Sequence, residues 1–261
     1  MGAGLDGQSL GLPLTGERTV PDLAHEHYWF TRHLAAYSWA LARCHGTVLD
    51  AGAGEGYGTA LLAQAAKLAV ALDIEQQVTA HAKQRYPGIQ VVTGNLWSWP
   101  LGADCVDVVV SLQVLEHLWD TSAFLAEAQR CLRPAGLLII STPNRLTFSP
   151  GLARGERPTN PFHVEEFDAE QLVGLLAASH FTDIALHGMI DGRGDALDQV
   201  LIGQPDPAAW SPSLRSRVAS TAIDDFPVVP LTTSLDRSRV NHEPRVLDLI
   251  VTAQTPSGAY R

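Results

Sequence analysis

A glutamate and a histidine stand side by side at positions 116 and 117, after an apolar run, 106–112, that is typical of a buried strand. Gln113 lies three and four residues before them, so in a helical turn the three side chains share one face. A carboxylate, an amide oxygen and an imidazole can together bind one divalent cation. The same residues also suit metal-free chemistry, in which His117 or Glu116 takes a proton from an acceptor.

A glycine-rich turn follows the first expected strand, 47–49. Its sequence begins with Asp50, and glycines then occupy alternate positions: Gly52, Gly54, Gly56 and Gly58. A strand, a glycine turn and a helix allow the backbone to approach a nucleotide-like ligand closely. The dinucleotide pattern G-x-G-x-x-G would require glycine at position 57, which is a tyrosine. The spacing therefore disfavours a nicotinamide oxidoreductase and leaves either another nucleotide-like ligand or a turn that serves packing alone.

Short apolar runs alternate with helical segments over the first 143 residues, at 47–49, 68–72, 89–93, 106–112 and 137–140. This alternation predicts a parallel sheet with helices on both faces. Functional residues of such sheets gather at the carboxyl ends of the strands. The polar residues that follow the five runs are Asp50, Asp73, Asn95, Gln113 and Asn144. Asp73 stands about 20 residues beyond the glycines, where a carboxylate can bind ribose hydroxyls.

Composition limits the classes of partner. The net charge of −10 and the absence of Lys/Arg runs disfavour nucleic acid. No apolar run reaches the roughly 18 residues that a membrane span needs. Residues 1–14 lack a signal-peptide pattern and are expected to form a disordered lead-in. Three isolated cysteines suit a reducing compartment, so we expect a cytoplasmic protein without a membrane partner.

The acidic-x-Gly-x-Gly-x-Gly turn, Asp73, Asn95 and the Glu116-His117 pair resemble the core of the class I S-adenosylmethionine (SAM)-dependent methyltransferases over residues 47–143. The resemblance implies a Rossmann-like, doubly wound α/β sheet, mostly parallel with an antiparallel last strand at 245–253, plus a lid insertion. It also implies SAM as cofactor, with Asp50 near the methionine amino group and Asn95 near the adenine amine. The implied cofactor-binding residues are Asp50, Gly52, Gly54, Gly56, Asp73, Ile74, Asn95, Leu96 and Leu112.

Strings flanking this core, at 15–22, 28–30, 141–150 and 160–163, resemble the mycobacterial sugar 1-O-methyltransferases of methylmannose polysaccharide synthesis. That resemblance implies an oligosaccharide acceptor, the 1-hydroxyl of a short mannoside as the methylated group, and a magnesium-type ion. We hold as candidate contacts of the acceptor or of the cofactor carboxylate the residues Glu17, Arg18, Arg32 and Asn144.

A resemblance to two groups of O-methyltransferases implies a complete set of metal ligands. The small-RNA 2′-O-methyltransferases and the ubiquinone-pathway O-methyltransferases carry Glu-x-x-Glu-His where this chain has Gln113 to His117, and they bind a divalent ion there. Glutamine removes one negative charge, which weakens binding. The RNA enzymes add a histidine after a Thr-Pro-Asn turn, and here Thr142-Pro-Asn144 is followed by His163. The implied ligands of Mg²⁺ are Gln113, Glu116, His117 and His163.

We expect one domain over residues 15–261, with an acceptor cleft and lid formed by the long, Pro-rich segments 145–166 and 190–245. Two other functions remain open. One is an RNA-end 2′-O-methyltransferase, which the negative charge disfavours. The other is a non-catalytic SAM-binding module, which the presence of Glu116, His117 and His163 disfavours.

Overall fold

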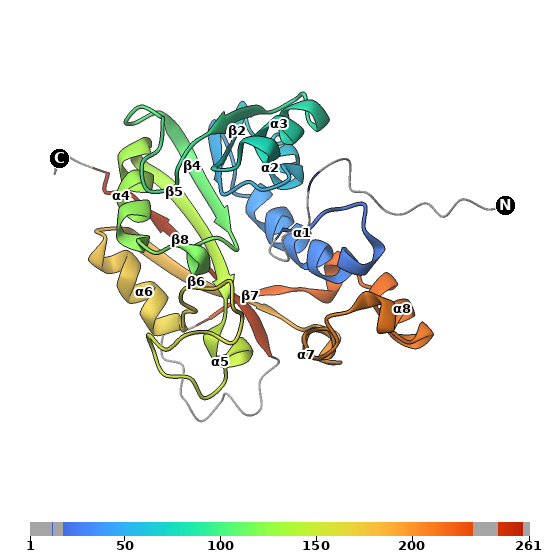
Figure 1. Ribbon diagram of the computed structural model, residues 1–261. Coiled ribbons are helices and arrows are strands. Elements are labelled where there is room, and N and C mark those ends of the chain that lie inside the picture. The colour runs from blue at the N-terminus through green and yellow to red at the C-terminus, as the bar shows by residue number, and fades with distance from the viewer. Residues whose placement is uncertain (1–11, 13–17, 232–244, 258–261) are drawn as a thin grey trace.

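A computed structural model describes residues 12, 18–231 and 245–257 (Figure 1). Apart from Leu12, the expected lead-in of residues 1–14 lies outside the described residues, as do Glu17 and positions 232–244 of the expected lid. The fold is an eight-stranded sheet with helices on both faces. The strands are β1 Thr47–Ala51, β2 Leu68–Asp73, β3 Gln90–Thr93, β4 Val106–Leu112, β5 Leu132–Pro143, β6 Thr182–Ile190, β7 Val228–Pro230 and β8 Val246–Gln254.

Eight α-helices and four short 3₁₀ helices connect or precede these strands in the described part of the chain. The α-helices are α1 His27–Leu41, α2 Tyr57–Leu62, α3 Gln76–Arg85, α4 Thr121–Cys131, α5 Arg145–Phe148, α6 Ala169–Ala178, α7 Leu197–Gly203 and α8 Pro212–Ala219. The 3₁₀ helices are η1 Ala24–Glu26, η2 Leu115–His117, η3 Pro207–Ala209 and η4 Ile223–Asp225.

The sheet order is β3-β2-β1-β4-β5-β8-β6-β7. Strands β1 to β5 are mutually parallel, whereas β8 lies between β5 and β6 and is antiparallel to both. The prediction of a mostly parallel, doubly wound α/β sheet with an antiparallel last strand is therefore confirmed. Strand β7, which pairs antiparallel with β6 at the edge, was not expected because three residues carry too little pattern.

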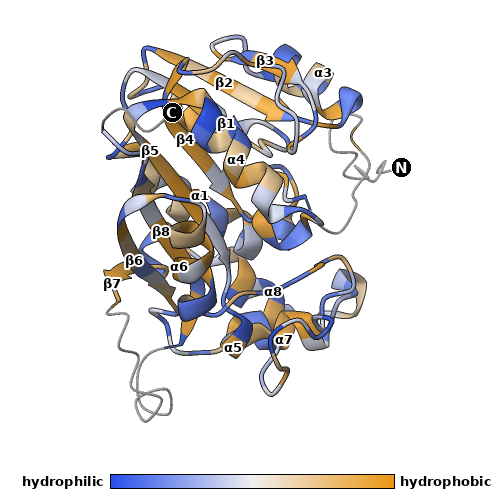
Figure 2. Cartoon of the chain, turned by 90° about the vertical axis from the view of Figure 1, so that its left-hand side faces the viewer, coloured by the Kyte–Doolittle hydropathy of each residue, from blue (hydrophilic) through white to orange (hydrophobic). Residues whose placement is uncertain are grey.

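Each central strand is buried on both faces, which explains its continuous apolar sequence. In β4, Val108 and Val110 belong to the core layer beneath α1, whereas Val109 between them belongs to the layer beneath α4 and α6. All three side chains are fully buried. Figure 2 shows apolar residues along the strands and polar ones on the outer helices and loops.

The segment between β6 and β8 packs against the first helix. Helix α1 contacts both α8 and η4, although more than 170 residues separate them along the chain (Figure 1). Arg32 of α1 reaches the sheet and forms a bidentate ion pair with Asp248 of β8. Segments near the two ends of the described chain are therefore in contact at this place.

Candidate functional site

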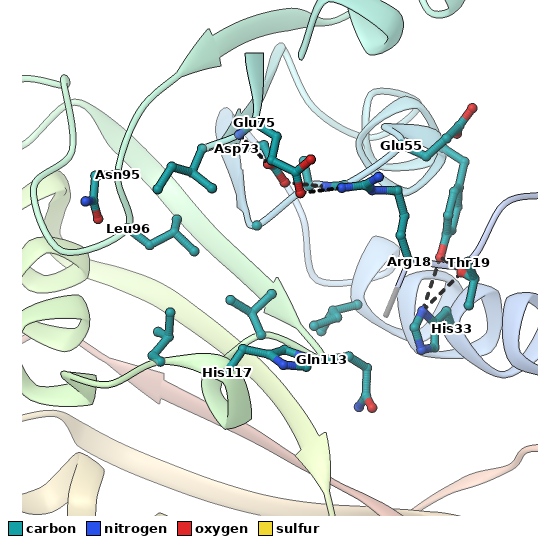
Figure 3. Close-up of a pocket in the computed structure, with 18 of the residues that line it drawn as sticks. Arg18, Thr19, His33, Glu55, Asp73, Glu75, Asn95, Leu96, Gln113 and His117 are labelled. Carbon is teal, nitrogen blue, oxygen red and sulfur yellow. Dashed lines mark hydrogen bonds and ion pairs between the residues drawn. The ribbon is translucent and has the colours of Figure 1, made fainter. Parts of the chain in front are cut away.

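Two cavities meet at the carboxyl ends of the parallel strands. The first, the glycine-turn cavity, measures about 380 Å³ and is bordered by the β1–α2 turn, Asp73 and Asn95. The second, the histidine cavity, measures about 350 Å³ and is bordered by His117, His163 and residues of α1. Five residues border both cavities and form the junction between them, namely Arg18, Thr19, His33, Gln113 and His117. Figure 3 shows the glycine-turn cavity and this junction.

The three glycines of the turn, Gly52, Gly54 and Gly56, differ in what a side chain would contact at each position. A Cβ on Gly52 would lie 2.5 Å from the Val114 side chain, and one on Gly56 would lie 2.9 Å from Ala82. A Cβ on Gly54 would meet nothing closer than Arg18 Cγ, at 3.9 Å. All three glycines have positive φ. Packing therefore requires Gly52 and Gly56, whereas the side of Gly54 faces space that a ligand could occupy.

Asp73 is held in place by backbone groups. Its Oδ2 accepts a hydrogen bond from the N–H of Gly54 at 2.9 Å, and its Oδ1 accepts one from the N–H of Glu75 at 3.0 Å. Each carboxylate oxygen keeps a further lone pair for a ligand. The carboxylate therefore faces the cavity in a fixed orientation, as bidentate ribose binding requires.

Asp50 does not border the glycine-turn cavity. It is fully buried beneath the turn, where Tyr37 donates to both carboxylate oxygens and Thr59 donates to Oδ2 at 2.6 Å. Burial raises the pKa of the Asp50 carboxyl to about 7. The expected contact with the methionine amino group is therefore corrected: Asp50 fixes α1 and α2 to the strand end through Tyr37 and Thr59.

The remaining expected cofactor residues border the glycine-turn cavity. They are Ile74, Asn95, Leu96 and Leu112. Asn95 accepts a hydrogen bond from the N–H of Trp97 through Oδ1, which orients its amide at the cavity edge. The neighbouring Trp97 and Trp119 also border this cavity and are 46% and 84% exposed. The cavity is thus rimmed by aromatic side chains near Asn95.

Glu116, His117 and His163 come together at the floor of the histidine cavity. Each offers one potential ligand atom, and these atoms lie within 4.8 Å of one another. Glu116 is 1% exposed, and burial raises the pKa of its carboxyl to about 7. Its Oε2 accepts a hydrogen bond from Thr142, and its backbone carbonyl accepts one from Val164 at 2.7 Å. The second contact brings the loop carrying His163 to η2.

The hydrogen bonds of the two histidines fix their tautomers. His117 Nδ1 lies 3.2 Å from the carbonyl oxygen of Phe162, and His163 Nδ1 lies 2.7 Å from a carboxylate oxygen of Glu166. Since both partners accept, each Nδ1 carries a proton, and whenever the ring is neutral its Nε2 has the lone pair. Burial lowers the pKa of His117, and nearby His163 lowers it further, so the imidazole is neutral near pH 7.

The expected helical face with Gln113 is wrong. Gln113 adopts φ +57°, and η2 begins only at Leu115, so positions 113 and 116 do not belong to one helix. The Gln113 amide nitrogen donates to Ser141 and to Asp248. The residue therefore borders the junction but is bound to the buried ion pair rather than grouped with Glu116 and His117.

Two of the expected acceptor residues have structural partners. Arg32 borders the histidine cavity, yet it is 3% exposed and paired with Asp248. Asn144 borders neither cavity; its amide caps α5 through Leu146 and donates to the carbonyl of Val246. Asn144 therefore acts in packing, and that expectation is corrected. Glu17 lies outside the described residues.

Arg18 bridges the two cavities. Its Nη2 pairs with Glu75 at 2.6 Å, whereas its Nη1 is buried without a hydrogen-bond partner. Figure 3 shows the guanidinium pointing across the glycine turn toward Glu75 and Asp73. A buried, unpaired N–H of a charged group is a costly arrangement that a bound acceptor atom relieves.

Several polar residues that border the cavities were not predicted from the sequence, and two of them, His33 and Glu166, lie close to the predicted ones. His33 of α1 lies at the junction, with Nδ1 near the hydroxyls of Thr19 and Tyr57. Glu166 lies in the histidine cavity behind His163. No motif in the sequence distinguishes His33 from the other polar residues of its helix. Glu166 stands three residues after His163, a spacing that could have been noticed.

The fold agrees with the comparisons to known proteins. A family model described as a methyltransferase domain matches residues 49–140. A probable SAM-dependent methyltransferase of Mycobacterium tuberculosis is 43% identical over 229 residues, which cover 84% of this chain and 82% of the relative. Another from Mycolicibacterium smegmatis is 45% identical over 231 residues, covering 84% and 88%.

Solved structures show the same fold. A SAM-dependent methyltransferase from Thermotoga maritima aligns with a TM-score of 0.58 at 15% identity, over 88% of this chain and 93% of its own. The chain belongs to the SAM-dependent methyltransferases, and its cofactor is SAM. Among the described helices, none is both long enough and apolar enough to cross a bilayer.

Proposed function

We propose that this methyltransferase transfers the SAM methyl group to a sugar hydroxyl, the 1-hydroxyl of a short mannoside in methylmannose polysaccharide biosynthesis, with a divalent metal. The observation that carries the proposal is the group of Glu116, His117 and His163, whose potential ligand atoms lie within 4.8 Å of one another. The group lies in the histidine cavity, next to the junction with the glycine-turn cavity.

The donor set fits a divalent ion. Both imidazoles have Nδ1 hydrogen-bonded to an oxygen, which leaves each Nε2 as the metal-binding atom, the arrangement typical of metal-ligating histidines. Glu116 supplies a carboxylate oxygen in a buried position. The Asn160 amide lies 3.0 Å from His163 Nε2 and must turn away for that nitrogen to bind an ion. Mixed oxygen and nitrogen ligands suit magnesium or manganese.

The chemistry requires activation of a weak nucleophile. A sugar hydroxyl is barely ionised near neutral pH, and a bound divalent cation lowers the pKa of a hydroxyl that it contacts. His117 is neutral and borders the junction, so its side chain can contact the acceptor group where the two cavities meet. Methyl transfer from the sulfonium is an in-line displacement, so the cavities must present both partners along one line.

The cofactor takes the glycine-turn cavity, with its ribose at Asp73 and its adenine at Asn95 and Leu96. The sulfonium methyl group then points through the junction into the histidine cavity. The histidine cavity has Trp29 and Phe148 in its wall, and aromatic faces suit a sugar ring that binds by stacking. The net charge of −10 supports a small neutral acceptor over RNA.

The test is methyl transfer from labelled SAM to a panel of manno- and gluco-oligosaccharides, with and without chelator. We expect a short mannoside to be methylated at its reducing end, activity to disappear on chelation, and added Mg²⁺ to restore it. The Glu116→Gln variant should lose this activity. Glu165→Gln is its matched control, because the Glu165 side chain is bound to Gln171 and lines neither cavity. Transfer to RNA ends but to no sugar would overturn the proposal.

A further inference from the structure

Glu166 stands in the wall of the histidine cavity with one carboxylate oxygen unpaired. Its side chain is 1% exposed. Oε1 accepts the Nδ1 proton of His163 at 2.7 Å, whereas Oε2 is buried without a hydrogen-bond partner. Leaving a buried carboxylate oxygen unsatisfied is costly, so this oxygen needs a donor. Since Glu166 lines the histidine cavity, a bound ligand can supply that donor.

This carboxylate is separate from the proposed metal group. The atoms that group around a possible ion belong to Glu116, His117 and His163, and Glu166 is not among them. Glu166 binds the Nδ1 edge of the His163 ring, whereas the proposed metal ligand is Nε2 on the other edge. The His163 ring, whose centroid lies 4.9 Å from that of His117, stands between Glu166 and this group. A ligand group at Glu166 Oε2 is therefore separated from the group held at Glu116 and His117 by about the width of one imidazole ring.

Both apolar and polar residues line the cavity around the Glu166 carboxylate. The histidine cavity combines apolar residues, among them Trp29, Phe148, Pro161 and Ile202, with a larger number of polar and charged ones. What distinguishes Glu166 among the polar residues is that its Oε2 has no partner within the protein, so a ligand donor can satisfy it. The Arg32 guanidinium is already bound to Asp248, so it does not pair with Glu166.

We infer that Glu166 is an acceptor-binding residue, whose Oε2 accepts a hydrogen bond from a second hydroxyl next to the one that receives the methyl group. The inference rests on the proposed function and narrows its substrate class: the enzyme selects acceptors with neighbouring hydroxyls over those with one. Its Oε1 at the same time holds His163 in the Nδ1-protonated form, so one side chain connects acceptor selection to the metal group.

The test compares wild type with Glu166→Gln on matched acceptors. A glutamine can still accept the His163 proton through its amide oxygen, but it then presents an N–H₂ donor to the cavity in place of an acceptor. We expect the KM for mannobiose to rise roughly 10- to 100-fold, the range for a charge-assisted hydrogen bond. The Kd for SAM and the urea midpoint should not change, and Glu165→Gln should resemble wild type.

Deoxygenated acceptors separate binding from a structural role. For wild type, mannobiose without the reducing-end 2-hydroxyl should lose the same 10- to 100-fold. For Glu166→Gln the loss should disappear, because the interaction is already gone. A merely structural Glu166, or one satisfied by a bound water alone, predicts an equal loss in both proteins. That outcome would overturn the inference.

A second pair of acceptors distinguishes this inference from the proposed function. Catechol carries neighbouring hydroxyls and phenol carries one. If no sugar is methylated but catechol is preferred over phenol, and the preference is lost in Glu166→Gln, the sugar proposal fails and the role of Glu166 stands. If sugars are methylated with unchanged KM in the variant, the role of Glu166 fails alone. If neither pair shows a preference for two hydroxyls, the inference fails.

Discussion

The backbone N–H of Gly54 donates a hydrogen bond to Oδ2 of Asp73 at 2.9 Å, which joins the turn after β1 to the end of β2. The carboxylate of Asp73 is thereby oriented before any ligand binds. Replacing Asp73 by Asn removes the charge and one acceptor, and we expect SAM affinity to fall by about 1.5–3 kcal/mol. Titration calorimetry measures it, with the exposed Asp183→Asn as control. Unchanged affinity in a folded Asp73→Asn protein would contradict the assignment.

Two glycines of the same turn should fail in different ways. Gly54→Val fills the space beside the turn and should abolish SAM binding, at a folding cost of about 1–2 kcal/mol for a non-glycine residue at positive φ. Gly52→Ala instead drives a methyl group to within 2.5 Å of Val114 and should lower the free energy of unfolding by a larger amount. Urea unfolding and SAM titration of both variants separate the effects. A Gly54→Val protein that binds SAM normally would refute the assignment of this space to the cofactor.

Metal dependence gives a sharp test of the histidine cavity. Glu116→Gln should reduce turnover by a factor of about 10² or more while leaving the Kd for SAM nearly unchanged, because Glu116 borders only the histidine cavity. Direct titration with Mn²⁺ should show the same variant binding the ion more weakly, which provides a readout besides activity. Full methyl transfer after exhaustive chelation would end the metal proposal and leave His117 as the candidate base.

The structure changes the expectation for Gln113. By analogy with Glu-x-x-Glu-His proteins, Gln113→Glu would be expected to tighten the ion. In this fold the Gln113 amide donates to the Asp248 carboxylate, so a glutamate would place two negative charges together. We expect the substitution to destabilise the fold by about 1–3 kcal/mol, and less at low pH, where the new carboxyl is protonated. Denaturant unfolding at pH 5 and 8 tests this, and a more stable variant at pH 8 would contradict it.

Buried carboxyls also predict how stability depends on pH. Burial raises the pKa values of Asp50 and Glu116 to about 7, above their ordinary values in the unfolded chain. Between roughly pH 4.5 and 7 these two carboxyls therefore hold more protons in the folded protein than in the unfolded chain, and the stability that they contribute falls as pH rises. Burial lowers the pKa of His33 to about 3, so that residue contributes in the opposite sense, and the comparison is made between variant and wild type. Without metal, Glu116→Gln should flatten this dependence, as measured by urea unfolding. Identical slopes for the variant and wild type would show that the Glu116 carboxyl does not cause the loss of stability.

Sequence patterns predicted the sheet well because each central strand is buried on both faces and reads as an apolar run. They failed where the backbone leaves regular geometry. The i, i+3, i+4 spacing of Gln113, Glu116 and His117 assumed a helix, yet Gln113 has positive φ. Asp50 and Asn144 were expected at the site because they follow strands, but their side chains turn inward to Thr59 and Val246. The position of a residue at the end of a strand determines where its backbone lies, but not the direction of its side chain.

Partners far apart in sequence were the second reason for failure. Nothing local in α1 shows that Arg32 binds Asp248, 216 residues later, so the residue seemed available for a ligand. The same holds for Glu166, which becomes notable only when Oε2 is seen to lack a partner. The assignments of residues 145–166 and 190–245 to a cleft and lid stay predictions, although Phe148, His163 and Ile202 border the histidine cavity.

The position of β8 affects how the protein can be made. Synthesis on the ribosome proceeds from the N-terminus, and of the described strands β8 emerges last, yet it lies between β5 and β6. Until residue 254 has been added, β6 and β7 have no place in the sheet, and Arg32 lacks the carboxylate of Asp248. The residues that border the glycine-turn cavity all lie between positions 18 and 119, so a nascent chain can form that cavity first, whereas the ion pair of Arg32 beside the histidine cavity forms only after translation reaches β8.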